Sequence, residues 1–378
     1  MLGCAASYYL AQGGARVVLL EKEQLNRQAS GQNAGSLHFQ LEHRMIEHGD
    51  ALATQFALSM PLVLDAVARW SDLQAELGED LEIVQEGGFI VAETREEIEL
   101  LEKKRTLESK WNLETELLTG DEARRMAPYL SKTIQAAGYY SKEGHANPRL
   151  IAPALARAAM RLGAEVSTNQ TVNYLARSNG KWTVRTESGL ELGTETVLVM
   201  AGAWTGRVAA LANVNLPVIP VALSMMATEA VSPTISHLVQ HVGRRLSMKQ
   251  MRDGNVLIGG GWPAWLRRKQ HYPDIDASPE LVFESLAGSA ALASRVVPAV
   301  RDLRLIRTWS GLVGVTPDQI PVLGEVRRRP GLFVAIGGSG FTIGLTYARL
   351  LSEQILRGRS SLPMDIYSPH RLDHLNPV

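Results

Sequence analysis

The first residues of the chain have the types and spacing of a nucleotide-binding turn. Gly3 opens a helix of small residues, and Glu21 follows the apolar run 17–20, with Lys22 beside it. In a Gly-x-Gly-x-x-Gly turn, backbone N–H groups at the start of a helix bind a pyrophosphate, and an acidic residue about 20 positions later binds a ribose hydroxyl. Gly3 fits the third glycine and Glu21 fits the acid. The pattern predicts dinucleotide binding.

Two glycines and a strand of this motif have no counterpart, since they would precede Met1. We therefore expect a truncated N-terminus or a misassigned start, and poorer nucleotide binding by this form than by an extended one. Two alternatives stay open at this point. One is a flavin-deficient remnant without catalytic activity, and the other is an NAD-dependent dehydrogenase.

Composition limits the class of protein. The 378 residues have a hydrophobic fraction of 45%, a formal net charge of zero and one cysteine, Cys4. The neutral balance gives no reason to expect nucleic acid as a partner. One cysteine permits no internal disulfide, and the histidines lack paired metal-ligand spacing, so we predict no metal site. No apolar run reaches membrane-spanning length. We expect a cytoplasmic protein, with peripheral contact with the inner membrane as an alternative.

Buried-strand and helix patterns alternate at the start, middle and end of the chain, and extra strands are inserted between them. This order predicts an α/β fold with α+β elements. We expect a discontinuous Rossmann-like nucleotide-binding domain from residues 1–80, 137–215 and 305–378. An interleaved substrate domain with an antiparallel sheet would comprise residues 81–136 and 216–304. A ligand site is expected between the two, at the carboxyl ends of the parallel strands.

The order and spacing of four segments make the chain resemble the D-amino-acid oxidase family of flavoproteins. The resemblance is to the branch of glycine oxidase, sarcosine oxidase and the opine and hydroxyproline dehydrogenases. The segments are Gly3–Glu21, Ala29–Gly35, Val199–Trp204, and Trp309–Gly311 with Thr316–Gly324 and Gly337–Gly344. The likeness runs along essentially the whole chain. It implies a Rossmann-like FAD-binding domain and FAD as the cofactor, rather than NAD.

The resemblance also implies which residues contact FAD. Glu21 would bind the adenosine ribose, Val172 would meet the adenine through its backbone, and the glycine turn near the C-terminus would present N–H groups to the oxygen edge of the flavin ring. The complete implied set is Gly3, Glu21, Lys22, Ser30, Asn33, Ala34, Gly35, Val172, Ala201, Gly202, Trp204, Gly311, Gly338, Ser339, Gly340, Phe341, Thr342 and Ile343.

The implied reaction is oxidation of the C–N bond of an amino acid or amine by hydride transfer to the flavin. In glycine-oxidase-like relatives an arginine follows the Trp-x-Gly element, whereas this chain has Val313 there. Replacement cations for a substrate carboxylate are Lys249, Arg252 and Arg307, each with a solvated or structural role as the alternative.

The segment Ala29–Gly35, called the flavin loop below, is one of the segments that carry the resemblance. His38 follows this loop and is a further candidate for the site. We therefore expect a carboxylated secondary amine as substrate, such as an imino acid, an opine or a sarcosine-like compound, rather than glycine or a simple D-amino acid. Oxygen, a quinone or a partner subunit would accept the electrons.

Overall fold

The computed structural model describes residues 1–376. One half of the molecule, which we call the cofactor side, contains short strands from distant parts of the chain: β1 (Val18–Leu20), β7 (Glu165–Ser167), β11 (Val197–Val199), β19 (Val322–Glu325) and β20 (Leu332–Ile336). β1 pairs in parallel with β7. β11 pairs in parallel with β20, which pairs in antiparallel fashion with β19. β19 and β20 are largely buried, whereas β1, which is the apolar run 17–20 of the sequence, is only partly buried. The α/β fold class is confirmed.

A large sheet forms the other half of the molecule. Its strand order is β18-β12-β15-β14-β13-β3-β5-β4, and every pair is antiparallel except β13 with β3. The strands are β3 (Gly88–Ala92), β4 (Glu116–Thr119), β5 (Ala136–Tyr140), β12 (Ile219–Ala230), β13 (Leu238–His241), β14 (Ser247–Gln250), β15 (Asn255–Gly259) and β18 (Leu305–Val315).

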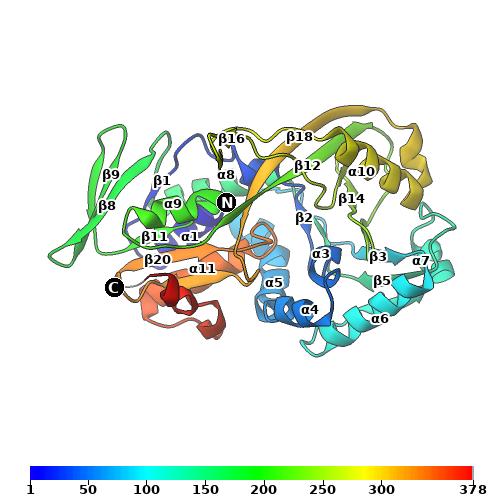
Figure 1. The fold of residues 1–378 in the computed structure, drawn as a ribbon, viewed down its shortest axis with the longest axis horizontal. Coiled ribbons are helices and arrows are strands. Elements are labelled where there is room, and N and C mark those ends of the chain that lie inside the picture. Colours follow the sequence, from blue (N-terminus) through cyan, green and yellow to red (C-terminus); the bar gives the residue numbers. More distant parts are fainter. Residues whose placement is uncertain (377–378) are drawn as a thin grey trace.

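This sheet includes two strands from ranges that we assign to the cofactor domain. β18 lies in the range 305–378, and β5 spans the proposed boundary at 137. β12 and β18 are long enough to extend from the cofactor side of the molecule to its far side (Figure 1). The division into domains therefore stays a prediction, with these strands shared by both halves.

Helices pack closely around the start of the chain. α1 (Leu2–Gln12) contacts both α8 (Pro148–Arg161) and α11 (Gly344–Arg357). Its buried residues include Ala5, Ala6 and Ala11, whose small side chains permit this close approach. Asn147 caps α8, since its side chain accepts a hydrogen bond from the backbone N–H of Arg149.

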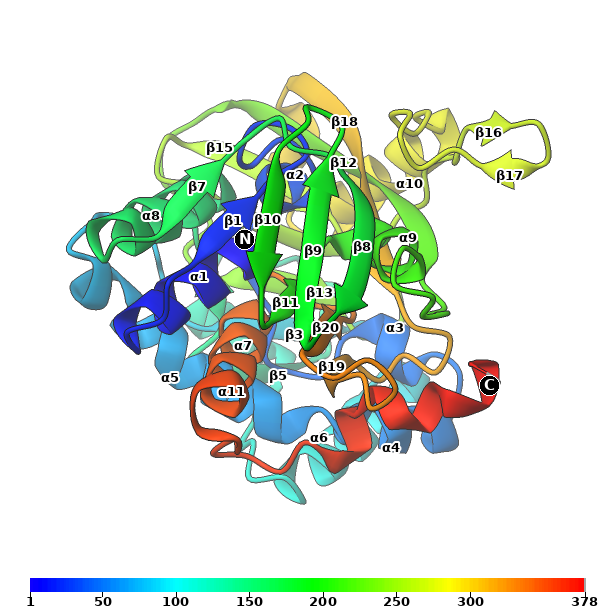
Figure 2. The same cartoon turned by 90° about the vertical axis from the view of Figure 1, so that its left-hand side faces the viewer.

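The remaining elements cover these sheets. An outer sheet of β8 (Val172–Ser178), β9 (Lys181–Thr186) and β10 (Glu191–Thr194) lies at one end, and the hairpin β16 (Arg268–Lys269) and β17 (Tyr272–Pro273) projects from the body (Figure 2). Further elements are α2 (Ala29–Gln32), β2 (Ser36–Leu37), α3 (His43–Ile46), α4 (Asp50–Ala57), α5 (Met60–Leu77), α6 (Arg95–Ser109), α7 (Gly120–Met126), β6 (Gly144–His145), α9 (Thr205–Ala210) and α10 (Phe283–Val296).

Within residues 1–376, no single helix is both long and apolar enough to cross a membrane. α4 and α5, which meet at a bend of 50°, pass that test only as a pair, by length and composition.

Candidate functional site

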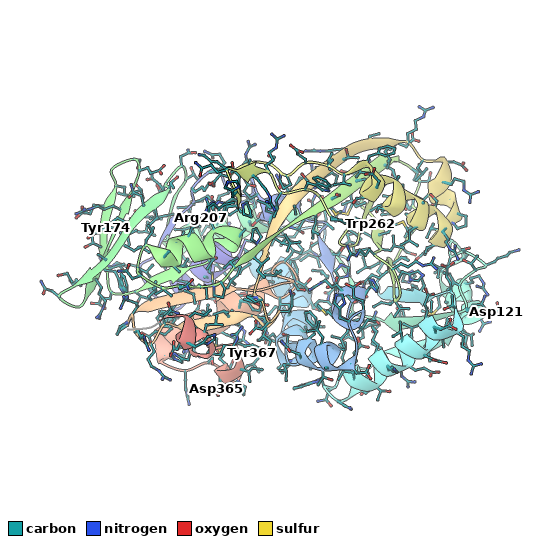
Figure 3. All side chains as sticks on the ribbon, viewed as in Figure 1. Asp121, Tyr174, Arg207, Trp262, Asp365 and Tyr367 are labelled. Atoms are coloured by element: carbon teal, nitrogen blue, oxygen red, sulfur yellow. The ribbon has the colours of Figure 1, made fainter. Side chains whose placement is uncertain are left out.

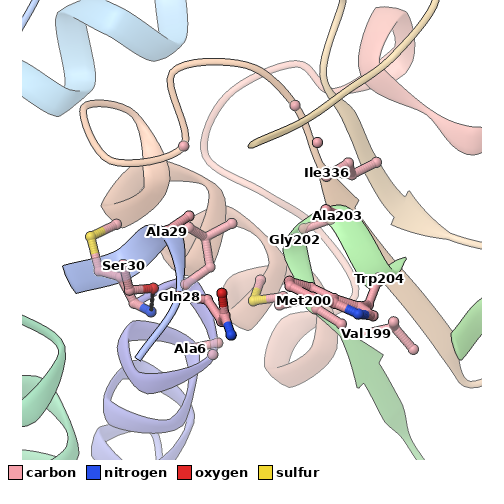
Figure 4. A pocket seen from close by; sticks show the side chains of 18 of the residues that line it. Ala6, Gln28, Ala29, Ser30, Val199, Met200, Gly202, Ala203, Trp204 and Ile336 are labelled. Carbon is pink, nitrogen blue, oxygen red and sulfur yellow. Dashed lines mark hydrogen bonds between the residues drawn. The ribbon is translucent and has the colours of Figure 1, made fainter. Parts of the chain in front are cut away.

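A cavity of about 2020 Å³ lies between the cofactor side and the large sheet. Typical sites for a small ligand occupy about 300–1,000 Å³, so this cavity has room for a dinucleotide together with a substrate. The start of α1, the end of β1, the loop that contains α2, the turn after β11 and the turn before α11 all line it. Figure 4 shows Ser30 on one side of this cavity, and Gly202 and Trp204 on the other.

Glu21 and Val172 lie at the nucleotide end of the cavity. Glu21 directly follows β1, and its Oε1 accepts a hydrogen bond of 3.0 Å from the backbone N–H of Glu23. This bond holds the carboxylate near the carboxyl end of a parallel strand, where such folds bind a ribose. Val172, the first residue of β8, also lines the cavity. Both residues therefore line the cavity, and their contacts with adenosine stay a prediction.

Lys22 lines the same end, but its charge is already paired. Its Nζ lies 2.7 Å from Asp276, which also accepts hydrogen bonds from Trp204 Nε1 at 2.8 Å and from Arg207. Burial alone would raise the pKa of the Asp276 carboxyl, but these three donors outweigh burial and lower it. Arg207 lies on the same side of the molecule as Tyr174 of the outer sheet (Figure 3). The ion pair from Lys22 and the hydrogen bond from Trp204 thus hold the segment around Asp276 against the nucleotide end of the cavity.

The start of α1 lies next to the loop that contains α2. A Cβ added to Gly3 would lie 3.1 Å from Leu19 Cδ1, so the glycine permits close contact of helix and strand. Ser30 Oγ accepts a hydrogen bond of 2.8 Å from the amine of Met1. Gly3, Ser30 and Ala34 all line the cavity. The helix start therefore directs its N–H groups and its positive dipole toward this space.

Asn33 and Gly35 shape this loop. The Asn33 side-chain amide donates to the carbonyl oxygens of Ala29 and Ser30, and its Oδ1 accepts from the backbone N–H of Gly35 at 2.7 Å. Gly35 has φ +73°, and a Cβ there would lie 2.1 Å from the carbonyl oxygen of Ala146. Both residues line the cavity, but the structure uses the Asn33 side chain to hold the loop, not to reach a ligand.

The glycine turn before α11 closes the opposite end. Gly338, Ser339, Gly340, Phe341 and Thr342 all line the cavity. Ile343 does not, because its side chain is 4% exposed and its backbone N–H already donates to Ser339 O at 2.9 Å. The implied N–H contact of Ile343 with the flavin is therefore not supported by the structure.

Three further implied contacts can be placed. Ala201 and Gly202 line the cavity, and no atom lies within 4 Å of a Cβ added to Gly202, so the backbone there is open to a ligand. Gly311 does not line the cavity, because the Gln32 side chain covers it: a Cβ on Gly311 would lie 3.2 Å from Gln32 Oε1.

Two of the four polar candidates for the substrate site lie outside the cavity, on exposed surface. Arg252 forms an ion pair with Asp80 at 2.5 Å, and its side chain is 53% exposed. Arg307 is exposed on β18, with its guanidinium 5.7 Å from the Trp309 ring. The turn after β14 and the outward face of β18 direct these two arginines to solvent, so neither is positioned to bind a substrate carboxylate.

The other two candidates lie at or next to the cavity wall. His38 lines the cavity, and burial lowers its pKa to about 4. Lys249 is 1% exposed and does not line the cavity, but its Nζ donates to Ser36 Oγ at 2.5 Å, and Ser36 does line it. Lys249 therefore reaches the site through a hydroxyl group, not through direct contact with a substrate.

Arg44 is a cavity-lining cation at the glycine turn that the sequence did not single out. Its Nη2 donates to Ser339 Oγ at 2.7 Å and to Glu42 Oε1 at 3.2 Å, so the guanidinium lies at the glycine turn. Burial would raise the pKa of Glu42, but Arg44 and His38 outweigh burial and lower it. The only sequence signal is the polar triplet Glu42-His43-Arg44 shortly after the flavin loop. This triplet does not by itself indicate a site, because Arg44 reaches the cavity only where α3 packs against the glycine turn.

The arrangement fits FAD. The lining includes a helix start, an acid at the end of a parallel strand, an open glycine and a turn of small residues, which together match a dinucleotide with a ring system at one end. The imidazole Nδ1 of His38 is also buried without a hydrogen-bond partner among residues 1–376, which leaves a polar atom available to a bound molecule.

Comparisons with known proteins agree with this fit. Residues 1–354 match the family model described as FAD dependent oxidoreductase (DAO). The chain is similar to one of the subunits of the opine oxidase of Rhizobium meliloti, with 24% identity over 99% of this chain and 95% of the relative. It is also similar to glycine oxidase of Geobacillus kaustophilus (strain HTA426), with 27% identity over 100% of this chain and 96% of the relative.

Among solved structures, L-proline dehydrogenase from P. horikoshii has the same fold, with a TM-score of 0.84 and 22% identity over 100% of this chain and 96% of that one. The family match argues against the two alternatives left open by the sequence, an NAD-dependent dehydrogenase and a flavin-deficient remnant. The glycine turn before α11, which an NAD-dependent enzyme would leave unexplained, agrees with this conclusion. The chain belongs to the DAO family of FAD dependent oxidoreductases, and FAD is its cofactor.

Proposed function

We propose that this flavoenzyme oxidises the C–N bond of a carboxylated secondary amine, such as an imino acid, an opine or an N-alkyl amino acid. The family match and the relatives support oxidation of an amine or amino acid, and the secondary amine is our proposal. FAD, when bound, supplies the hydride acceptor. The protein itself must bind the carboxylate, orient the carbon that loses hydride and exclude water.

The position of Arg44 carries the proposal. Val313 lines the cavity on β18, where glycine-oxidase-like relatives carry an arginine, so that wall of the cavity is apolar. The guanidinium of Arg44 instead comes from a different element, α3, and lies beside Ser339 of the glycine turn. A planar guanidinium can hold a carboxylate by two parallel hydrogen bonds. Moving the cation to another wall leaves space above Val313 for a substituent on the substrate nitrogen.

Apolar neighbours of Val313 support this interpretation. Leu223 and Val315 also line the cavity, and by strand pairing and alternation both lie on the same face of β12 and β18 as Val313. An apolar wall next to a carboxylate-binding arginine favours a substrate whose nitrogen carries a carbon chain or belongs to a ring. Glycine and D-alanine would leave this wall without a contact.

The test is anaerobic bleaching of the bound flavin by a panel of proline, hydroxyproline, sarcosine, an opine, glycine and D-alanine. We expect bleaching by one or more of the secondary amines. Bleaching by glycine or D-alanine alone would contradict the proposed substrate class. Flavin that no compound in the panel bleaches would contradict it as well.

The electron acceptor is part of the same proposal. One relative is a subunit of an opine oxidase, which supports a partner subunit as acceptor, with oxygen and a quinone as the other two. Reoxidation of the bleached protein by air, by a soluble quinone or by neither distinguishes the three. A cytoplasmic location also stays a prediction, supported by the single buried Cys4, which fits a reducing compartment.

A further inference from the structure

A buried row of hydrogen bonds connects Lys249 to the cavity wall. Lys249 Nζ lies 2.5 Å from Ser36 Oγ, Ser36 Oγ lies 3.2 Å from Ser247 Oγ, and Ser247 Oγ lies 3.2 Å from His38 Nε2. Ser36 and Ser247 are 6% and 5% exposed. His38 lines the cavity, and its Nδ1 has no partner among residues 1–376. Each atom in the row can both donate and accept a hydrogen bond once Lys249 is neutral.

The backbone explains why these four side chains meet. Ser247 and Lys249 are two residues apart on β14, so their side chains lie on the same face of the large sheet. Ser36 begins β2, and His38 directly follows this strand, with the same spacing of two. The loop that leads away from the cofactor thus crosses the inner face of the sheet and places one polar pair against the other.

Comparison with the other deeply buried lysine shows that Lys249 is unusual. Lys104 is 2% exposed, and its Nζ lies 2.8 Å from the carboxylate of Glu108. Lys249 is equally buried but forms no ion pair in the described part of the chain, and its hydrogen-bond partner is a neutral hydroxyl. A buried amine without a counter-ion is costly to keep charged, so a lysine at such a place is a candidate for proton transfer.

We propose that this row is a proton relay, in which His38 takes a proton from the ammonium group of the bound substrate and Lys249 finally receives one. The proposal rests on the amine substrate proposed above. A substrate N–H bond breaks and an N–H bond forms at His38 Nδ1, while His38 Nε2 gives its proton to Ser247. Ser247 gives its proton to Ser36, and Ser36 gives its proton to Lys249 Nζ.

No electrons move in this relay, and the charge passes from the substrate to the lysine. The imidazole only exchanges one tautomer for the other, so His38 need not stay protonated. The substrate amine is left neutral with a free lone pair. This is the form from which the adjacent carbon can lose hydride, because the lone pair stabilises the resulting iminium ion.

The surrounding ionisable groups are consistent with a neutral resting lysine. Burial lowers the pKa of Lys249 to about 7, so the free amine predominates above neutral pH. His145 on β6, opposite Ser36, stays neutral, because burial is the main cause that lowers its pKa to about 3. β15, which pairs with β14, has no ionisable residue.

Three other charged groups lie near the ends of the row. Glu42 and Arg44 act on His38 with opposite sign. Glu143 contacts Gln240, which is opposite Ser247 on β13, and burial raises the pKa of its carboxyl to about 7. None of these groups forms an ion pair with Lys249, so its state is expected to follow its own pKa.

The first test is the pH dependence of anaerobic flavin reduction at saturating amine. In the wild-type protein the rate should be constant above about pH 7 and fall about tenfold per pH unit below it. Lys249→Met, Ser36→Ala and Ser247→Ala each interrupt the row. In these variants the pH below which the rate falls should rise toward the pKa of the substrate amine in solution, which is about 10, as for a lysine amine. Reduction would then be about 100-fold slower at pH 8 and recover at high pH.

Matched controls are Lys269→Met on the exposed hairpin and Ser289→Ala, a buried serine on α10 outside the row. Both should keep the wild-type profile. A uniform loss of rate at every pH in the three row variants would mean a structural role and overturn the relay. The two serine variants keep the test valid if Lys249→Met does not fold. Failure of every amine to bleach the flavin would contradict the proposed function instead.

A second measurement does not depend on turnover. In protein with ¹³C-labelled lysine, the NMR signal that Lys249→Met lacks belongs to Lys249. At pH 8 this signal should have the shift of a neutral amine. In protein whose flavin has first been reduced by dithionite, and so can accept no further hydride, addition of the secondary amine that bleaches the flavin fastest in the panel should move it to the ammonium shift in the wild type but not in Ser36→Ala. An ammonium shift before the addition, or no movement in the wild type, would contradict the relay.

Discussion

The two ends of the cavity are built in different ways. At the nucleotide end, the contacts come from short continuous segments: Glu21 ends a strand, Gly3 opens a helix and Gly202 lies in a turn. At the substrate end, Arg44 comes from α3, Val313 from β18, and the residues behind His38 from β14. The first end depends on local backbone geometry, and the second depends on how distant elements pack.

This difference determines what substitutions should do. Backbone N–H groups and glycines serve every member of a fold that binds the same cofactor, so side-chain changes at the nucleotide end act mainly on affinity for FAD. Side chains at the substrate end select one substrate, so changes there act on turnover while the flavin stays bound. Three substitutions, from the largest expected effect to the smallest, test this contrast.

Arg44→Met should have the largest effect. It removes the guanidinium proposed to bind the substrate carboxylate but keeps a side chain of similar length. We expect a loss of about 100-fold in kcat/KM, equal to about 2.7 kcal/mol, which is within the range for a hydrogen bond between charged groups. Steady-state kinetics and flavin absorbance measure both outcomes, and the flavin content should stay unchanged.

The control for Arg44 is Arg245→Met, because Arg245 also lines the cavity but is exposed, with its guanidinium near Gly261 O. It should keep most of its activity. Equal losses in the two variants would show that any positive charge in the cavity suffices and that Arg44 is not the specific anchor.

The sequence signals for the cofactor are local. Glu21 and Val172 line the cavity at the nucleotide end, and the turn 338–342 lines it at the opposite end. The exceptions have local causes: Ile343 already uses its N–H within the turn, and Gln32 covers Gly311. Whether these residues contact FAD stays a prediction, but most of their positions follow from motifs that span fewer than about 20 residues.

The substrate end could not be predicted in the same way. Lys249 and Arg252 are three residues apart and have similar charge, yet one is 1% exposed and the other pairs with Asp80 in solvent. Strand alternation assigns Lys249 to a face of the sheet, but only the crossing of β2 over that face buries it. Arg44 was missed for the same reason, since its role depends on a partner, Ser339, far along the chain.

Glu21→Ala should have an intermediate effect and a different readout. The substitution removes a charge-assisted hydrogen bond to the ribose, which is worth about 1.5–3 kcal/mol. Glu21 is only partly buried, so we expect the lower value and a roughly tenfold increase in the Kd for FAD, measured by fluorescence titration of the apoprotein. The flavin that remains bound should be reduced by substrate at the wild-type rate.

Glu23→Ala is the matched control for Glu21, because Glu23 lies two residues further on, outside the cavity, and bonds to Gln28. Its Kd for FAD should equal that of the wild type. An unchanged Kd in Glu21→Ala would remove the strongest side-chain contact proposed at the nucleotide end, and an equal rise in both variants would assign the effect to the loop.

Arg252→Met should have the smallest effect, although it removes a cation close in sequence to Lys249. Its guanidinium pairs with Asp80 on the surface, and exposed pairs of this kind contribute little. We expect kcat/KM within twofold of the wild type and unchanged flavin content. The local effect should still be measurable, since the hydrogen bond from Arg252 is the main reason that the pKa of Asp80 is lowered to about 2. In Arg252→Met this pKa should rise toward that of an ordinary aspartate, which NMR titration of the carboxyl carbon would detect. A large loss of activity together with that rise would move Arg252 back into the substrate end. An unchanged pKa would mean that the ion pair does not form in solution.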